Sequence, residues 1–269
     1  SGNNAMIVTG DFTFYTSRVY NQNTYDFKDS TIIDSTICNR IARIKDNGYL
    51  DSTWRFDKNA PGYKNTKGAS LPGPNGPIQS LQDEKGNILL YGQYTSFDGA
   101  PVNSIVRIDP TSGLTDPSFK SGGTTQRIER VSYNATLKKY LVVGDFLTFD
   151  GKATPYMVRL NYDGSVDNTF TSKVFDGGVP NFVKLLNDGL AVVGGTFRSY
   201  DGVIRNGFAV IDATGALADG YNSIGNVNGS IYNVYETTSA DNKRALLIMG
   251  SFSLFDNVPK NNIVRVTFQ

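Results

Sequence analysis

The 269-residue sequence contains no histidine and only one cysteine, Cys38. The absence of histidine excludes a Ser-His-Asp triad, a zinc site with histidine ligands and an imidazole general base. A single cysteine excludes an internal disulfide bond, so cysteine content does not identify the redox compartment. Because no histidine can activate its thiol, Cys38 is expected to be a small packed side chain rather than a nucleophile.

Long apolar runs and an excess of charge are also missing. No stretch reaches the roughly 18 uninterrupted apolar residues of a membrane span, and residues 1–5 lack the basic and apolar regions of a secretory signal. The 26 basic and 25 acidic residues leave a formal net charge of +1, so no global field would hold the protein on nucleic acid. We therefore predict no nucleic-acid partner and no membrane span.

What the sequence does contain is an internal repeat. A short apolar run ends in Gly-x-aromatic five times, at Gly10, Gly92, Gly144, Gly195 and Gly250. From the second glycine onward the steps are 52, 51 and 55 residues, a period typical of one four-stranded blade. The pattern predicts an all-β chain that forms a single β-propeller domain over residues 1–269, with five blades of antiparallel strands and insertions in the first unit.

Strand positions follow from alternating apolar residues and polar turns. In the third repeat we expect strands near residues 128–132, 140–146 and 156–160, and a short fourth strand before Phe170. No long window has a 3.6-residue apolar period, so very little helix is expected. The chain begins at the second strand of one unit and ends at the third strand of another. We therefore expect residues 5–12 to lie close to the last unit, in one composite blade.

Two further landmarks recur at fixed distances from the glycines. One is an arginine, which follows the glycine by fifteen residues in three repeats and by more in the first, while Val210 replaces it in the fourth; the series is Arg43, Arg107, Arg159 and Arg265. The other is the aspartate of an aromatic-Asp-Gly or aromatic-Asp-Asn turn, found as Asp98, Asp150, Asp201 and Asp256. A large aromatic residue closes each full unit.

Both landmarks have a structural interpretation and a functional one. An aspartate before glycine in a tight turn usually bonds backbone amides, which favours a structural role over a ring of ligand-binding carboxylates. The arginines are expected to tie the third strand to a neighbouring turn aspartate or carbonyl, because a buried guanidinium needs such partners. A ring of ligand-facing arginines is the alternative.

This set of motifs resembles the delta-60 repeat family. The resemblance is carried best by Val192-Val193-Gly194-Gly195-Thr196-Phe197, by Val158-Arg159-Leu160-Asn161 and by residues 163–170, and in five units it covers nearly the whole chain. It implies a propeller from a bacterial secreted or surface-anchored protein, with the domain as part of a longer chain and a lipid anchor allowed on that parent. The family implies no particular activity.

Two insertions interrupt the spacing in the first unit. Gly10 to Arg43 spans 33 residues instead of 15, and Arg43 to Gly92 spans 49 where the corresponding distance is 37. Both belong to connections on the same face of a blade. Aromatic rings among amides and hydroxyls suit a carbohydrate or peptide ligand. The candidate ligand-binding residues are Tyr15, Tyr20, Tyr25, Phe27, Tyr63 and Lys64. A structural cap is the alternative interpretation.

The sequence predicts no cofactor. Calcium has candidate ligands in two pairs, Asp163 with Asp167 and Asp46 with Asp51, but neither stretch has the repeated Asp-x-Asp pattern followed by a bidentate glutamate. A weaker acidic cluster is formed by Asp26, Asp29 and Asp34. No metal site is therefore predicted.

From these features we predict an extracellular or bacterial cell-surface module that binds or scaffolds, with recognition on the face of the first-unit insertions. One alternative is a histidine-free carbohydrate-active enzyme, a glycosidase or lyase that uses carboxylates. The other is a purely structural repeat in a longer protein.

Overall fold

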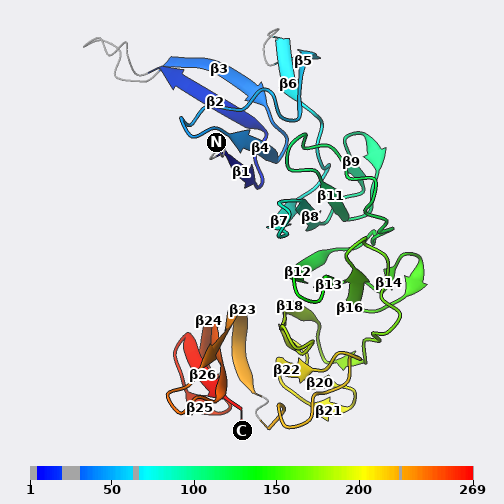
Figure 1. Ribbon diagram of the computed structural model, residues 1–269, viewed down its shortest axis with the longest axis vertical. Coiled ribbons are helices and arrows are strands. Elements are labelled where there is room, and N and C mark those ends of the chain that lie inside the picture. Colours follow the sequence, from blue (N-terminus) through cyan, green and yellow to red (C-terminus); the bar gives the residue numbers. More distant parts are fainter. Residues whose placement is uncertain (1–4, 20–30, 63–66, 224–225, 269) are drawn as a thin grey trace. The chain divides into compact units, whose positions relative to one another are not determined.

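The computed structural model describes residues 5–19, 31–62, 67–223 and 226–268 (Figure 1). Over these residues the chain is all-β and contains no helix, so no described segment could cross a membrane as a helix. The chain divides into two compact units, Ser1–Asp116 and Pro117–Gln269, and each is described by itself. We number the repeats by their anchor glycines, from the first to the fifth: Gly10, Gly92, Gly144, Gly195 and Gly250.

The first compact unit holds the first two repeats. Its strands are β1 (Met6–Thr9), β2 (Phe14–Val19), β3 (Thr31–Ile37), β4 (Ile41–Ile44), β5 (Phe56–Pro61), β6 (Lys67–Ser70), β7 (Ile78–Gln82), β8 (Ile88–Gly92), β9 (Ser96–Phe97), β10 (Ala100–Pro101) and β11 (Ile105–Ile108). In the first repeat β1 pairs with β4, and β2–β3 and β5–β6 form separate hairpins. In the second, β8 lies between β7 and β11, and β9–β10 form a two-residue hairpin.

The second compact unit holds the other three repeats. Its strands are β12 (Ile128–Asn134), β13 (Lys139–Gly144), β14 (Thr148–Phe149), β15 (Lys152–Ala153), β16 (Met157–Asn161), β17 (Phe175–Asp176), β18 (Pro180–Leu185), β19 (Ala191–Gly195), β20 (Ser199–Tyr200), β21 (Val203–Ile204), β22 (Phe208–Ile211), β23 (Val227–Thr238), β24 (Arg244–Phe255), β25 (Val258–Pro259) and β26 (Ile263–Thr267). The antiparallel sheets β12-β13-β16, β18-β19-β22 and β23-β24-β26 repeat one strand order (Figure 1).

The strands expected in the third repeat exist with small shifts at their ends. Asp145 and Phe146 lie beyond the end of β13, and Tyr156 precedes β16 because its φ of 67° is incompatible with a strand. The expected fourth strand shrinks to one isolated bridge, between Leu160 and Val166. It recurs in the other three repeats that have this segment, as Ile44–Leu50, Ile108–Thr115 and Ile211–Leu217. The number of blades in a closed ring and the composite blade remain predictions, as does the single domain.

In the sheet of the fourth repeat, alternate residues of a strand enter two different hydrophobic cores. In β19, Ala191 and Val193 pack into a core shared with the third repeat, while Val192 packs into a core shared with the fifth. The same alternation places Ala209 of β22 in the first of these cores and Val210 in the second. Both faces of the sheet are therefore covered by neighbouring sheets, which explains why these strands are apolar at almost every position.

Four of the five anchor glycines are required by close approach of the backbone rather than by a special φ, namely Gly92, Gly144, Gly195 and Gly250. A Cβ on Gly144 would lie 2.2 Å from the carbonyl oxygen of Arg127, and one on Gly195 would lie 2.3 Å from that of Val179. The pairing register shifts at both places, since the first strand of the sheet bulges where it passes the glycine. Any side chain there would displace the first strand.

The aspartate turns are tight hairpins. The four aspartates Asp98, Asp150, Asp201 and Asp256 have φ values between 50° and 53°, and the following residue also has positive φ. Two successive positive φ values define the type I′ turn that two-residue hairpins favour. This geometry accounts for the Asp-Gly sequence structurally, as the turn chemistry predicted.

Replacing Gly144 with alanine is expected to destabilise the protein by about 2–3 kcal/mol, because the new Cβ would overlap the Arg127 carbonyl. The matched control is Gly10→Ala at the same position of the first repeat, where a Cβ would meet only the Phe12 ring at 3.7 Å. Urea unfolding of both variants tests this expectation. Equal free energies of unfolding in the two variants would contradict it.

Candidate functional site

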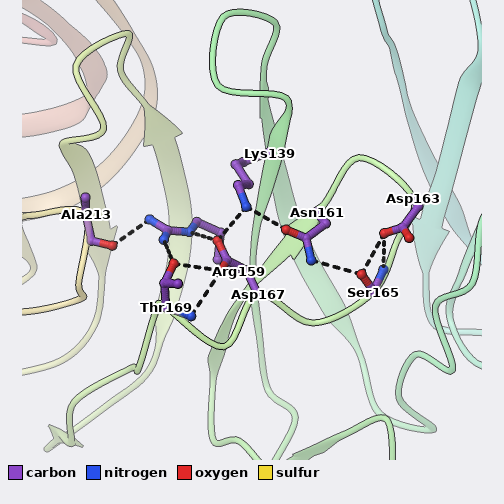
Figure 2. Close-up of polar contacts among 8 residues, drawn as sticks. All are labelled: Lys139, Arg159, Asn161, Asp163, Ser165, Asp167, Thr169 and Ala213. Carbon is purple, nitrogen blue, oxygen red and sulfur yellow. Dashed lines mark hydrogen bonds and ion pairs between the residues drawn. The ribbon is translucent and has the colours of Figure 1, made fainter.

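The repeat arginines form ion pairs with an aspartate in the segment that follows their strand. In the third repeat, Nε of Arg159 donates to Oδ2 of Asp167 at 2.8 Å (Figure 2). Both side chains are less than a tenth exposed. Arg43 pairs in the same way with Asp51, and Arg107 with Asp116. The same ion pair is thus present in three of the four repeats that contain both the arginine position and the aspartate position.

Two of these guanidinium groups also bind the next repeat. Nη1 of Arg159 donates to the carbonyl oxygen of Ala213 at 2.7 Å, and Nη1 of Arg43 donates to that of Pro110 at 3.2 Å. Each of these arginines therefore joins its own strand to the turn of its neighbour. A hydrogen bond between a charged donor and a neutral acceptor in a buried place contributes more than a neutral pair. The arginines are engaged by the protein itself.

The aspartate that pairs with the repeat arginine is not the turn aspartate that the sequence suggested. Arg107 does not pair with Asp98 of the aromatic-Asp-Gly turn; that carboxylate instead accepts from Arg55, with Nη2–Oδ1 at 2.5 Å. The expected carbonyl partner is present, but the aspartate lies eight or nine residues after the arginine, because the isolated bridge folds that segment back beside the strand. Arg265 makes no ion pair with any described residue.

The fourth repeat lacks both the arginine and the aspartate of the ion pair. Val210 stands at the arginine position and Ala218 at the aspartate position, so an apolar pair replaces the ionic one. The backbone contact is kept, since the N–H of Ala218 donates to Val210 O at 2.9 Å as that of Asp167 does to Arg159 O. The amide of Asn222 bonds both the N–H and the carbonyl of Val210.

Asp167 lies at the centre of a chain of polar contacts. Burial tends to raise its pKa, but hydrogen bonds from Lys139, Thr169 and Arg159 outweigh burial and hold the pKa well below its ordinary value. From Lys139 the chain continues through Asn161 and Ser165 to Asp163 (Figure 2). The pKa of Asp163 is also lowered, mainly by the Ser165 hydroxyl.

The aromatic residue that closes a repeat packs on the following turn. A Cβ on Gly113 would come within 2.5 Å of the Trp54 ring, and one on Gly164 within 2.8 Å of the Phe119 ring. Trp54 also donates from Nε1 to the Pro110 carbonyl at 3.2 Å. The turn glycine and the closing aromatic are thus two parts of one contact.

Three of the four calcium candidates, Asp51, Asp163 and Asp167, accept hydrogen bonds from protein donors. Asp163 accepts from the amide and hydroxyl of Ser165, and Asp51 accepts from Arg43 and Thr53. Among the described residues, no group of three or more histidine, cysteine or acidic side chains could hold a metal. Asp26, Asp29 and the side chain of Asp34 lie outside the described part.

The structure describes one of the six candidate ligand-binding residues. The hydroxyl of Tyr15, on β2, donates to the carbonyl oxygen of Gly48 at 2.9 Å, which fixes the ring beside the turn after β4. The other five lie in the sequence between β2 and β3 or between β5 and β6, outside the described residues: Tyr20, Tyr25, Phe27, Tyr63 and Lys64. Their role remains a prediction.

Two acidic side chains have raised pKa values. Burial is the main cause for Glu129, opposed by Arg127 and reinforced by Asp145, and burial is also the main cause for Asp150, opposed by backbone N–H groups of Gly122 and Gly123. Arg127 pairs with the Glu129 carboxylate at 2.9 Å.

A surface hollow of about 400 Å³ was not anticipated from the sequence. It lies between the fourth and fifth repeats, within the second compact unit, and no acidic side chain lines it. Its lining residues are Gly195, Thr196, Phe197, Arg198, Asn206, Gly207, Val227, Gly229 and Ser230. An alignment of the repeats could have suggested it, because Gly207 occupies the position of Tyr156.

A family model described as a "domain of unknown function (DUF5122) beta-propeller" matches residues 86–119 and 138–170. Each match contains an anchor glycine, the paired arginine and aspartate, and the closing aromatic, as in Gly144, Arg159, Asp167 and Phe170. The repeats are of propeller type. The delta-60 assignment remains a prediction.

No curated protein matches the chain. A glycoside hydrolase family 43 protein from Bacillus licheniformis is 13% identical over 87% of this chain and 50% of its own, with a TM-score of 0.25. The endo-1,5-alpha-L-arabinanase from Thermotoga petrophila RKU-1 is 12% identical over 95% and 77%, with a TM-score of 0.25. This chain spans half the length of the first protein. At such TM-scores neither similarity carries an argument about fold or activity.

Substituting Asp167→Ala alone is expected to cost about 3 kcal/mol, because it leaves Arg159 buried without its carboxylate. The double variant Arg159→Val/Asp167→Ala, which copies Val210 and Ala218, should be more stable than that single variant. A double-mutant cycle measured by urea unfolding tests the coupling. Additive effects of the two substitutions would contradict an energetic pair.

Stability is also expected to fall in acid. The pKa of Asp167 is lower in the folded chain than its ordinary value of 3.8, so its contribution is present above about pH 4 and is lost as the pH decreases further. Urea unfolding between about pH 5 and 2 should show a shallower decline for the double variant than for the native sequence. If the free energy of unfolding declined equally with pH in both proteins, protonation of Asp167 would not contribute to the loss of stability in acid.

Proposed function

We propose that this chain is an extracellular binding module of propeller type that holds a carbohydrate or peptide ligand on the hairpins of its first repeat. The observation that carries the proposal is the pair of hairpins β2–β3 and β5–β6. The extracellular location is supported by the resemblance of the repeats to the delta-60 family.

The position of β2–β3 shows how the first repeat departs from the others. In the second repeat, the two-residue hairpin β9–β10 stands between the second and third strands of the sheet. In the first repeat, β2–β3 stands at that place, between β1 and β4, with strands of six and seven residues. The first insertion is thus an enlarged form of the short aspartate hairpin.

The second insertion lies against the first. The hairpin β5–β6 belongs to the connection between Trp54 and β7, and β6 contacts β3. The hydroxyl of Ser70, at the end of β6, bonds the thiol of Cys38 at 3.6 Å, just after β3. Cys38 is buried and its pKa is raised by burial, as expected of a packed thiol. Two segments far apart in the sequence therefore form one surface.

The chemistry of this surface suits recognition. The described part of β5 exposes Asp57, Lys58 and Asn59, and the Phe14 ring at the start of β2 is 44% exposed. Charged, amide and aromatic groups on the two hairpins supply both hydrogen bonds and apolar contact for a sugar or peptide. In the third repeat, by contrast, Arg159 and Phe170 are engaged in contacts with the next repeat.

A glycan and peptide array with the purified chain tests the proposal. Binding is expected, and Tyr20→Ala/Tyr25→Ala or Tyr63→Ala should weaken it about tenfold or more, since each removes a stacking ring. Tyr232→Ala is the matched control, because Tyr232 is a 60% exposed tyrosine on β23 in the fifth repeat.

Two results would overturn the proposal. Loss of binding in the Tyr232 variant, with the first-repeat variants unaffected, would place recognition elsewhere. Absence of binding by a folded chain would favour a structural repeat, whereas release of sugar products would favour a carboxylate-based enzyme.

A further inference from the structure

The hollow between the fourth and fifth repeats has a counterpart between the third and fourth. Tyr156 lies twelve residues after Gly144, the anchor glycine of the third repeat. Phe175 pairs with Tyr200, the aromatic residue of the aspartate hairpin in the fourth repeat. The rings of Tyr156 and Phe175 meet at 6.4 Å in a T-shaped contact. In the next pair of repeats, Gly207 and Val227 occupy these two positions, since Val227 pairs with Phe255 as Phe175 pairs with Tyr200. Two rings are thereby absent.

Three polar substitutions accompany the loss of the rings, one of which is Asn206 at the position of Pro155. Arg198 takes the position of Leu147, three residues after the anchor glycine, and Ser230 takes that of Val179. All five changed residues, with Gly207 and Val227 included, line the hollow. Two glycines support this alignment of the two pairs of repeats. A Cβ on Gly178 would overlap the backbone of Thr196, and a Cβ on Gly229 would overlap the backbone of Ser251, which occupies the same position in the fifth repeat.

The polar groups of the hollow differ in their availability. The Thr196 hydroxyl bonds the backbone of Val179, and the Asn206 amide donates to Asn226. Arg198 and Ser230 make no side-chain hydrogen bond to described residues, and the stem of Arg198 lies over Gly177, which holds its direction. Because no acidic side chain is among the residues that line the hollow, a guanidinium and a hydroxyl there favour a carboxylate.

We propose that this hollow binds an aromatic ring that bears a carboxylate. The ring would fill the space that Tyr156 and Phe175 occupy in the preceding pair of repeats, and the carboxylate would accept hydrogen bonds from Arg198 and Ser230. The ligand is either a free aromatic acid or the C-terminal aromatic residue of a polypeptide. This site belongs to the second compact unit and does not depend on the function proposed for the first-repeat hairpins.

The probes are 4-hydroxyphenylacetate, p-cresol as the ring without a carboxylate, and acetyl-Gly-Gly-Tyr with a free or an amidated C-terminus. Binding is followed by NMR shifts of the backbone amides of the intact chain. Saturable shifts at Thr196, Gly207 and Ser230 are expected with 4-hydroxyphenylacetate. Tighter binding of the free-carboxylate peptide would identify a polypeptide source, and binding of the free acid alone a small-molecule source.

Val227→Phe should weaken the binding of 4-hydroxyphenylacetate about tenfold or more, because a phenyl ring at this position would fill the hollow. The fourth repeat already carries phenylalanine there, as Phe175. Val203→Phe, the same change on the exposed strand β21, is the matched control and should bind as the native chain does.

The double variant Arg198→Leu/Ser230→Val introduces the residues found at these positions between the third and fourth repeats. It tests whether Arg198 and Ser230 bind the carboxylate, without changing the hydrophobic core. It should weaken 4-hydroxyphenylacetate severalfold and leave p-cresol unchanged, and it keeps the proposal testable if Val227→Phe does not fold. Arg127→Leu is its control, since Arg127 is exposed and lies outside the hollow. Unsaturable shifts, or equal binding by the native chain and a folded Val227→Phe variant, would overturn the proposal.

Discussion

Burial of both faces of a sheet is the constraint on which the rest of this structure depends. In β19 and β22, adjacent residues point into different cores, so neither face is available to water. Side chains on such strands must be apolar or must find polar partners from a neighbouring sheet. The repeated motifs are the places where the chain meets this requirement.

The motifs act at the edges of the packed sheets. The arginine is buried and needs a counter-charge, which the aspartate on the next segment supplies, and its remaining N–H groups reach a carbonyl of the next repeat. The closing aromatic covers the turn glycine of that same neighbour. Within each compact unit, the first repeat is thereby joined to the second, and the third to the fourth, by a hydrogen bond from the arginine to a carbonyl oxygen and by aromatic packing on the turn glycine. The fourth repeat shows that the ion pair within a repeat can be replaced by a matched apolar pair.

Functional sites are therefore expected at positions where one repeat differs from the others in side chains or in loop length. A position that is filled in one pair of repeats and open in the next has no packing reason to be open, because the scaffold tolerates the filled version. The hollow at Gly207 and Val227 is such a place. The enlarged hairpins of the first repeat are another, since a two-residue hairpin suffices elsewhere.

The sequence alone determined the all-β class, the repeat boundaries and the turns. These features depend on local chemistry: strand alternation, the Asp-Gly turn and the spacing of Gly144 from Arg159 act within one repeat and are visible in it. Only the tertiary structure decided which aspartate pairs with which arginine, and that Gly207 and Val227 line one hollow. Those contacts join residues of different segments, and their partners are selected by how the chain folds back and how sheets pack, which spacing along the sequence does not encode.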